Sequence, residues 1–456
     1  MNKFLETIRN IWKIEELRTK IIFTLAMILV YRFGSFVPLP GIDLSVIDAD
    51  ILSARGGDSG SGFLDLLNAF TGGGFSRASI LALGIMPYIS ASIVVQLMGF
   101  AVPGIQKLQK DGESGRKKIT QITRWLTIAI CLVQAPAYLT SVTNFFLPYS
   151  DPAINAAYVI PPDSIWFWFP STILLVAGTM FAMWLGEKIT DRGIGNGISL
   201  LIMIGIMADL PRAFLSEVQM QPGIYVLFEV VAFLACILAC VVLVMGVRQV
   251  PVQYVGRAQG GRSNYMKTFT NTVRQYIPLK VNAAGVMPII FAQAIMFLPG
   301  VLAGVIYEEG NIPGFFQQLS DPFSFWYSVV FGILVILFTF FYTAVTIQVN
   351  QMAEDLRRNG GIIPRVKPGL DTANFLDDIL SKITLPGAIF LAILAILPAI
   401  AYKLGVGAGF AYFFGGTSLL ILVGVTLDTI QQINTYLLNH HYDGMMQTDR
   451  VKRKMA

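Results

Sequence analysis

Long apolar runs alternate with short polar segments along the whole chain. A helix of about 20 apolar residues crosses the roughly 30 Å hydrocarbon core of a bilayer. The runs have almost no polar face, unlike the surface helices of soluble proteins. The pattern therefore predicts an all-α chain with ten transmembrane helices, at residues 21–37, 78–102, 125–146, 165–186, 194–208, 224–247, 281–306, 323–349, 383–402 and 410–427.

The composition agrees with a membrane protein. Of the 456 residues, 54% are hydrophobic and 13% are charged, and the mean hydropathy is +0.63. A soluble fold could not bury this much apolar surface. All three cysteines lie within predicted spans, where they are expected to act as small core residues, so neither a disulfide framework nor a zinc site is indicated.

The basic residues predict the orientation of the spans. Of the 33 lysines and arginines, 28 lie on one set of alternating flanks, which includes both ends of the chain. The opposite flanks carry only Arg55, Arg77, Arg212 and Lys403. By the positive-inside rule, both termini are expected in the cytoplasm, which agrees with an even number of spans because both ends then lie on the same side.

Few ionisable residues lie within or beside the spans. Arg32, Glu229 and Asp428 each lie near the end of a run, and both histidines, His440 and His441, follow the last one. Ion pumps and intramembrane enzymes place carboxylates, histidines or arginines near the middle of the bilayer. We therefore expect no catalytic residue, no metal ion and no cofactor.

The stretch GIGNG at residues 193–197 superficially resembles a phosphate-binding loop. Its glycines do not follow the dinucleotide-binding pattern, and no strand precedes them. The stretch instead predicts a tight turn at which neighbouring helices approach closely.

One interruption of the apolar pattern occurs twice. GIMPYISA at residues 84–91 lies in the second predicted span, and GVMPIIFA at 285–292 lies in the seventh. Chance could produce such a short match, because Gly and Pro are frequent in membrane helices. The matching positions nevertheless predict two halves of five spans, the second inverted because five is odd. We assign the N-terminal half to residues 1–210, the C-terminal half to 211–438 and a cytoplasmic tail to 439–456.

The segment between the first two spans, residues 38–77, is too long for a simple hairpin. It contains FLDLLNAFTGGGFSRAS, a short amphipathic stretch followed by three glycines. Two interpretations remain open at this point. The segment either folds back into the membrane as a half-helix shielded by protein, or forms an exposed loop.

Several long motifs, in order along nearly the whole chain, resemble the bacterial SecY family, the channel subunits of the Sec protein translocon. The resemblance implies two five-helix halves around a pore that opens across the membrane and, between spans two and seven, sideways into lipid. The motifs are VYRFGSFVPLPGID (30–43), SRASILALGIMPYISASIVVQLM (76–98), KDGESGRKKITQITR (110–124), TMFAMWLGEKITDRGIGNGIS (179–199), YIPLKVNAAGVMPIIFA (276–292) and FFGGTSLLILV (413–423).

The resemblance also implies a ring of apolar residues at the waist of the pore. An isoleucine within a span, taken alone, more often packs in a core or faces lipid, so only the resemblance selects the ring positions. A dry apolar constriction excludes ions by dewetting and offers no fixed hydrogen bonds to a passing polypeptide. Motif matching places the ring at Ile85, Ile89, Ile198, Ile202, Ile290 and Ile421.

The half-helix is similar to the family's plug, and the two interrupted helices to its lateral gate. The plug and its glycine hinge correspond to Phe63, Leu64, Leu67, Phe70, Gly72, Gly73 and Gly74. The lateral gate corresponds to Met86, Pro87, Ser90, Gln134, Asn282, Met287 and Pro288. A hydrogen bond between polar gate residues would hold the gate shut by about 0.6 to 2 kcal/mol, although Gln134 could also simply join helices.

The basic cytoplasmic loops are candidate docking surfaces for a motor or a ribosome. They could also serve only to set the topology. The residues expected to dock are Arg248, Arg257, Arg262, Lys267, Arg365 and Lys367. In IIPRVKPGLDT (362–372) the sequence departs from the family, because Lys367 occupies the position of its usual arginine.

The resemblance implies a protein-conducting channel, not an enzyme, in the cytoplasmic membrane of a bacterium. It would translocate signal-bearing unfolded polypeptides and release hydrophobic segments into the bilayer. The implied partners are SecE-like and SecG-like small membrane subunits, a SecA-like ATPase and the ribosome. A secondary transporter of a small solute remains the alternative, because such transporters share inverted repeats and interrupted helices.

Overall fold

A computed structural model describes residues 14–43, 71–143, 158–254, 274–296 and 321–455, apart from Asp163 and Ala294, together with Trp12, Gly314, Gln318 and Leu319. The chain forms two compact units. The first contains residues 1–220, 408–410 and 424–456, and the second contains 221–407 and 411–423.

The first unit is built from helices. They are α2 (Glu15–Gly34), α5 (Met86–Ala101), α6 (Pro103–Lys110), α7 (Gly112–Ser141), α9 (Ile165–Arg192), α10 (Gly197–Met220) and most of α18 (Gly416–Met455). α7 packs against both α5 and α9, and α9 packs against α2 and α10. Ser164 caps α9, since its side chain accepts a hydrogen bond of 3.3 Å from the backbone N–H of Trp166.

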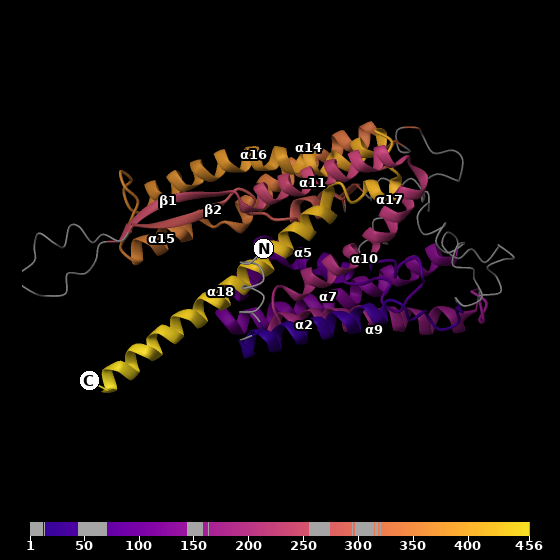
Figure 1. The fold of residues 1–456 in the computed structure, drawn as a ribbon, viewed down its shortest axis with the longest axis horizontal. Helices are drawn as coiled ribbons and strands as arrows, with labels where there is room; N and C mark the ends of the chain where they lie inside the picture. The colour runs from indigo at the N-terminus through magenta and orange to yellow at the C-terminus, as the bar shows by residue number, and fades with distance from the viewer. Residues whose placement is uncertain are drawn as a thin grey trace, which may run out of the picture. The chain divides into compact units, whose positions relative to one another are not determined.

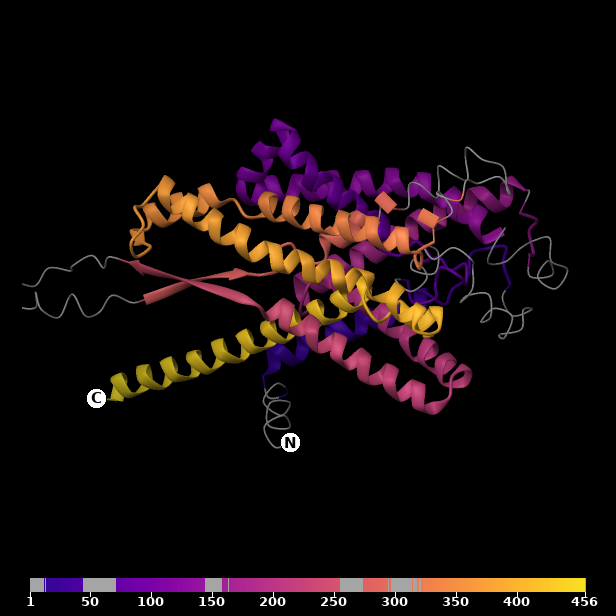
Figure 2. The same cartoon turned by 90° about the horizontal axis from the view of Figure 1, so that it is seen from above.

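The second unit combines apolar helices with a small sheet. Its helices are α11 (Gly223–Met245), α14 (Phe325–Thr346), α15 (Val349–Arg358), α16 (Leu370–Lys403) and the first part of α18, while α17 (Ala408–Ala411) bridges the division. α14 and α16 run side by side (Figures 1 and 2).

The prediction of an all-α chain was wrong in one respect, because the second unit contains a β-sheet. Strands β1 (Val247–Tyr254), β2 (Arg274–Lys280) and β3 (Gly361–Ile362) form an antiparallel sheet in the order β2-β1-β3. Val250 and Val252 on β1 are buried with Leu279 on β2, against side chains of α15 and α16. The basic residues of the segment 248–280 indicated a cytoplasmic loop, but the alternation of buried and exposed positions in β1 is typical of a strand.

The helical, multi-pass character of the chain is confirmed. Among the described residues, seven helices are long and apolar enough to cross a membrane: α7, α9, α10, α11, α16, the stretch Phe325–Arg358 that contains α14, and Gly416–Leu438 of α18. α2 contains most of the first predicted span but ends at Gly34, and α5 is a shorter apolar helix within the second. The seventh predicted span is helical at 287–293 and extends beyond the described residues.

The two Met-Pro motifs start helices instead of interrupting them. Gly84 and Gly285 both have positive φ, +52° and +64°. Helical structure begins two residues later in each case, at Met86 and at Met287, with proline next. Proline suits the first turn of a helix because its missing N–H would have no helical partner there. The same local geometry thus occurs once in each unit.

Candidate functional site

Four of the six predicted ring isoleucines belong to the first unit, as two pairs one helical turn apart. Ile85 is the N-cap residue of α5 and Ile89 lies in its first turn. They are 4% and 9% exposed, and the N–H of Ile89 donates to the carbonyl of Ile85 at 3.1 Å. On α10, Ile198 and Ile202 are partly buried. Each helix therefore presents two branched apolar side chains along one face.

The other two ring isoleucines belong to the second unit. Ile290 is partly buried in the helical stretch 287–293, and Ile421 is buried on α18. Within each unit these positions are buried or partly buried. The ring of all six stays a prediction.

The turn at residues 193–197 fixes the start of α10, as the glycine pattern predicted. The N–H of Ile194 donates to Oγ1 of Thr24 at 3.1 Å, and that of Gly197 donates to Oγ1 of Thr190 at 2.9 Å. A Cβ atom on Gly197 would collide with the carbonyl of Gly186 on α9. Ile198 follows directly, so its position is set by contacts with α2 and α9.

The residues before α5 form a buried, irregular segment. Thr71 to Ser76 are all buried, and Gly72 and Gly73 have φ values of +63° and +82°. Residues 71–85 therefore lie inside the first unit, as expected of a segment shielded by protein. The predicted plug residues Phe63, Leu64, Leu67 and Phe70 lie outside the described residues.

Charged groups gather beside this segment. Burial lowers the pKa of Arg77, and the nearby cations Arg212 and Arg32 add to the effect, while the carboxylate of Asp209 opposes it. Arginine stays charged in proteins even so. The first unit thus holds three cations and one anion near residues 71–77, a cluster that the sequence pattern did not indicate.

The predicted gate residues lie at the starts of two helices, on α7 and at the partly buried position 282. Met86, Pro87 and Ser90 lie in the first turns of α5, and Met287 and Pro288 begin the matching helix of the second unit. Gln134 is exposed on α7. Asn282 is partly buried, and its Oδ1 atom accepts no hydrogen bond from any described residue. An orphaned buried acceptor is costly, which suits a residue that exchanges partners.

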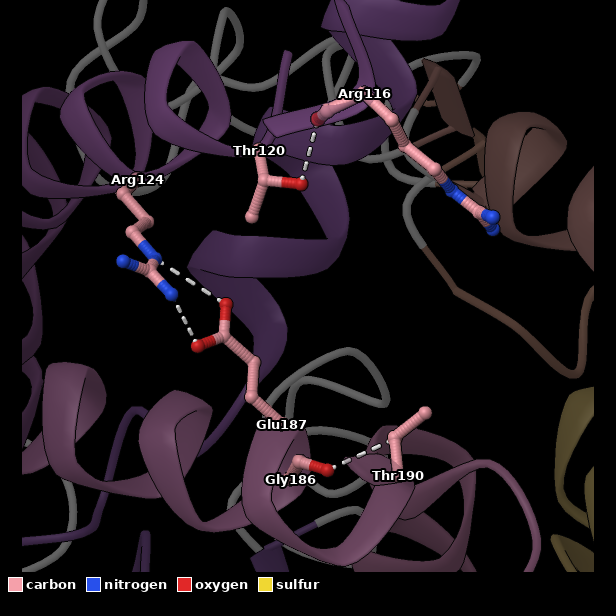
Figure 3. A network of polar contacts seen from close by, with 6 residues as sticks. All are labelled: Arg116, Thr120, Arg124, Gly186, Glu187 and Thr190. Carbon is pink, nitrogen blue, oxygen red and sulfur yellow. Dashed lines mark hydrogen bonds and ion pairs between the residues drawn. The ribbon is translucent and has the colours of Figure 1, made fainter. Parts of the chain in front are cut away.

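An ion pair joins α7 to α9 (Figure 3). Nε of Arg124 donates to Oε1 of Glu187 at 3.2 Å, and Nη2 donates to Oε2, so the pair is bidentate. The two side chains are 46% and 20% exposed. Thr120 and Thr190, also labelled in the figure, bond the carbonyls of Arg116 and Gly186 in their own helices.

Comparison with known proteins decides the family. The SecY family model matches residues 79–430. The protein translocase subunit SecY of Mycobacterium bovis is 36% identical over 455 residues, which covers 98% of this chain and 100% of that protein. The chain belongs to the SecY family.

Solved structures share the fold of this SecY-family chain. One, described as the structure of a protein conducting channel, has a TM-score of 0.61 and 19% identity, with 92% of each chain covered. Another, described as Sec61 in the canine ribosome-channel complex from the endoplasmic reticulum, has a TM-score of 0.59 and 19% identity, also with 92% of each chain covered.

The loops of this SecY-family chain that are predicted to be cytoplasmic expose part of the predicted docking set. Arg248 is exposed on β1, and Arg365 and Lys367 are exposed in the turn before α16. Arg365 has a φ of +68°, and the carbonyl of Lys367 accepts a hydrogen bond of 2.8 Å from Oγ1 of Thr372. Arg257, Arg262 and Lys267 lie outside the described residues.

The sequence motifs did not identify the residues that bond the 193–197 turn to its neighbours or join α7 to α9. Thr24, Thr190 and Glu187 bond partners on other helices or in the 193–197 turn. Threonine and glutamate occur throughout the chain, so nothing in the local pattern separates them from surface residues. A buried threonine within an apolar run, such as Thr24, was the only available signal.

Proposed function

We propose that this SecY-family chain is the protein-conducting channel of a bacterial cytoplasmic membrane, with both termini in the cytoplasm. Membership of the family over nearly the whole chain carries this conclusion. The chain would translocate unfolded, signal-bearing polypeptides and release hydrophobic segments into the bilayer. It would act only as a channel and would catalyse no reaction on the translocated polypeptide.

The pathway would run between two inverted halves of five spans each, residues 1–210 and 211–438, followed by a tail at 439–456. The shared geometry of Gly84 and Gly285, each followed by a helix that starts with Met-Pro, supports this arrangement. The two helices that follow these glycines would form the lateral gate.

The six isoleucines would close the waist of the pore. Their apolar side chains would exclude ions from the resting channel and yield around a chain without binding it. The half-helix at residues 63–75 would seat below this ring as a plug. Asn282 and Gln134 would contribute to the closed gate through hydrogen bonds weak enough for a signal sequence to replace.

Energy and stability would come from partners. A SecA-like ATPase or a translating ribosome would drive transport, and SecE-like and SecG-like subunits would brace the halves. The exposed cations Arg248, Arg365 and Lys367 support docking of acidic or phosphate-rich partners. Lysine at position 367 makes a point contact, whereas arginine could bind a carboxylate or phosphate with two hydrogen bonds.

Site-specific photocrosslinking tests the pathway. A photoreactive residue replaces Ile89 or Ile290 in the membrane-embedded complex, and a secretory chain is stalled during translocation. Both positions should crosslink to the stalled chain, and the crosslinks should disappear when the signal is made polar. A matched probe at exposed Phe228 on α11 should give no crosslink. A stalled chain that engages the complex without contacting either isoleucine would overturn the pore assignment.

A further inference from the structure

Arg32 is an unusual residue at the end of an apolar helix. It lies in the last turn of α2 and is partly buried. Its Nη1 atom donates a hydrogen bond of 3.3 Å to the carbonyl of Gly72. The guanidinium also lies 5.5 Å from the ring centre of Phe36, and that of Arg77 lies 4.8 Å from the same ring. Arg32 thus attaches residues 72–77 to α2.

Gly72 is packed too tightly for any other residue. Its φ is +63°, and a Cβ atom would collide with Arg32 Nη1 and lie 2.9 Å from the carbonyl oxygen of Gly205 on α10. Cβ atoms essentially never approach backbone so closely. The missing side chain therefore allows a close contact with α2 and α10, in addition to the positive φ.

Tyr138 attaches the same segment to α7. Its hydroxyl donates a hydrogen bond of 2.7 Å to the carbonyl of Phe75, and the two rings pack edge to face with centres 4.6 Å apart. Both residues are almost fully buried, at 3% and 4% exposure. The carbonyl of Phe75 also accepts a longer hydrogen bond of 3.4 Å from the N–H of Ala78, so the Tyr138 hydroxyl is the nearer of two donors to this buried acceptor.

The following residues pair with the chain that leaves α2. The N–H of Leu39 donates to the carbonyl of Ala78 at 2.8 Å, and the N–H of Ile80 donates to that of Val37 at 2.9 Å. The segment 72–80 is therefore held by α2, α7, α10 and residues 37–39. A hinge requires free backbone, and this stretch has its carbonyls and amides engaged on several sides.

We propose that Arg32 and Tyr138 are positioning residues that clamp residues 72–80 as a fixed base, which stays in place when the channel opens. This inference rests on the proposed channel and plug. Gly72, Gly73 and Gly74 then serve close packing of the base against α2 and α10, in place of the hinge motion predicted from their sequence. The clamp keeps the resting channel sealed by holding the base of the plug in one position.

A disulfide within the base tests whether it moves. A Cβ atom on Gly74 would lie 3.8 Å from Cβ of Ser35, which matches the usual Cβ separation of about 3.8 Å in a disulfide. The double variant Ser35→Cys/Gly74→Cys is made in a full complex whose Cys131, Cys236 and Cys240 are replaced by alanine. Transport of a secretory polypeptide is then compared before and after oxidation.

We expect oxidised and reduced channels to transport at rates within about twofold of each other. A loss of more than tenfold on oxidation, restored by reductant, would show that the base must move and would overturn the clamp. The cysteine-free parent is the reference. If the parent in its intact complex transports no polypeptide, the proposed function fails, which is a different result from a loss that appears only on oxidation.

A second measurement needs no secretory polypeptide and no introduced cysteine. Tyr138→Phe keeps the ring contact and removes the hydroxyl, and Arg32→Met removes the donor to Gly72. Each should raise the resting leak of a small anion through reconstituted complex by about fivefold per assembled channel, because one hydrogen bond fewer then opposes dislodging of the base, a state distinct from opening by a translocating polypeptide. The control Tyr225→Phe lies on the exposed face of α11 and should not change the leak. Wild-type leak in both clamp variants would overturn the proposal.

Discussion

The backbone N–H of Gly195 donates a hydrogen bond of 2.9 Å to Oε1 of Gln432, although the two residues are 237 positions apart. Nearby, Nζ of Lys20 donates to the hydroxyl of Tyr436 at 2.8 Å and lies 4.1 Å from the centre of its ring. The turn before α10 and the start of α2 are thus both attached to α18. The Gly195 bond helps to fix the turn from which α10, the helix that carries Ile198 and Ile202, begins.

Gln432→Leu should lower the free energy of unfolding by about 1 to 3 kcal/mol, because the buried N–H of Gly195 loses its acceptor. Thermal unfolding of the purified complex in detergent would measure the change. The neighbouring Gln431 is exposed, and its side chain makes no hydrogen bond with a described residue, so Gln431→Leu is the control. Equal midpoints for the two variants would contradict the role of Gln432.

Gly197→Ala should destabilise the first unit by several kcal/mol. The added methyl would meet the carbonyl of Gly186, so α9 and α10 would have to separate where they cross. Gly104→Ala is the matched control, since it lies at the start of α6 with nothing within 4 Å of the added Cβ. The control should be neutral or slightly stabilising, by up to about 1 kcal/mol. Yield and thermal midpoint distinguish the two.

Arg124→Glu should weaken the contact between α7 and α9, and Glu187→Arg in the same chain should restore it. The pair is partly exposed, so solvent screens it and the coupling energy should be about 0.3 to 1 kcal/mol. A double-mutant cycle on thermal unfolding measures this coupling. The pair Asp378 and Lys382 on α16, with side chains 60% and 73% exposed, should show a smaller coupling. A larger coupling there would contradict the argument from burial.

Arg365→Gly should stabilise the turn before α16. A left-handed backbone costs roughly 1 to 2 kcal/mol for most residues and almost nothing for glycine, and Arg365 has a φ of +68°. Amide exchange of Val366, whose N–H donates to the carbonyl of Ile363 at 3.1 Å, should slow about fivefold or more. Lys367→Gly is the control, because it removes a charge two residues away without relieving a positive φ. The amide exchange of Val366 should not slow in this variant.

The sequence predicted those features that follow from local physics. Apolar runs such as 224–247 cannot form anything but a helix in a membrane, because each backbone amide there needs an internal partner. The tight turn at 193–197 followed from its glycines. The strand pair β1 and β2 was missed, because the alternation around Val250 is short and gains its meaning only when Leu279 packs beside it.

Some of the site residues were likewise indicated by sequence motifs, and others were found only in the structure. Motifs found the two Met-Pro pairs, which both start helices, because distinctive residues stand at fixed spacing. The six pore isoleucines stay a prediction from the same motifs. The motifs gave no indication of Arg32 and Tyr138 as partners of the residues after Thr71, because those contacts join segments 40 and 63 positions apart.

By itself, the sequence determined that this protein has many apolar helices of a multi-pass membrane protein and belongs to the SecY family, and it predicted the positions of the apolar pore ring. Composition, periodicity and long motifs are local properties of the chain. In a bilayer a long apolar run folds as a helix, because its backbone amides need partners within the same segment. Only the tertiary structure decided which side chains attach the turn at 193–197 and the segment 72–80 to their neighbours. Those hydrogen bonds depend on atoms brought within about 3 Å by packing, which no spacing along the chain specifies.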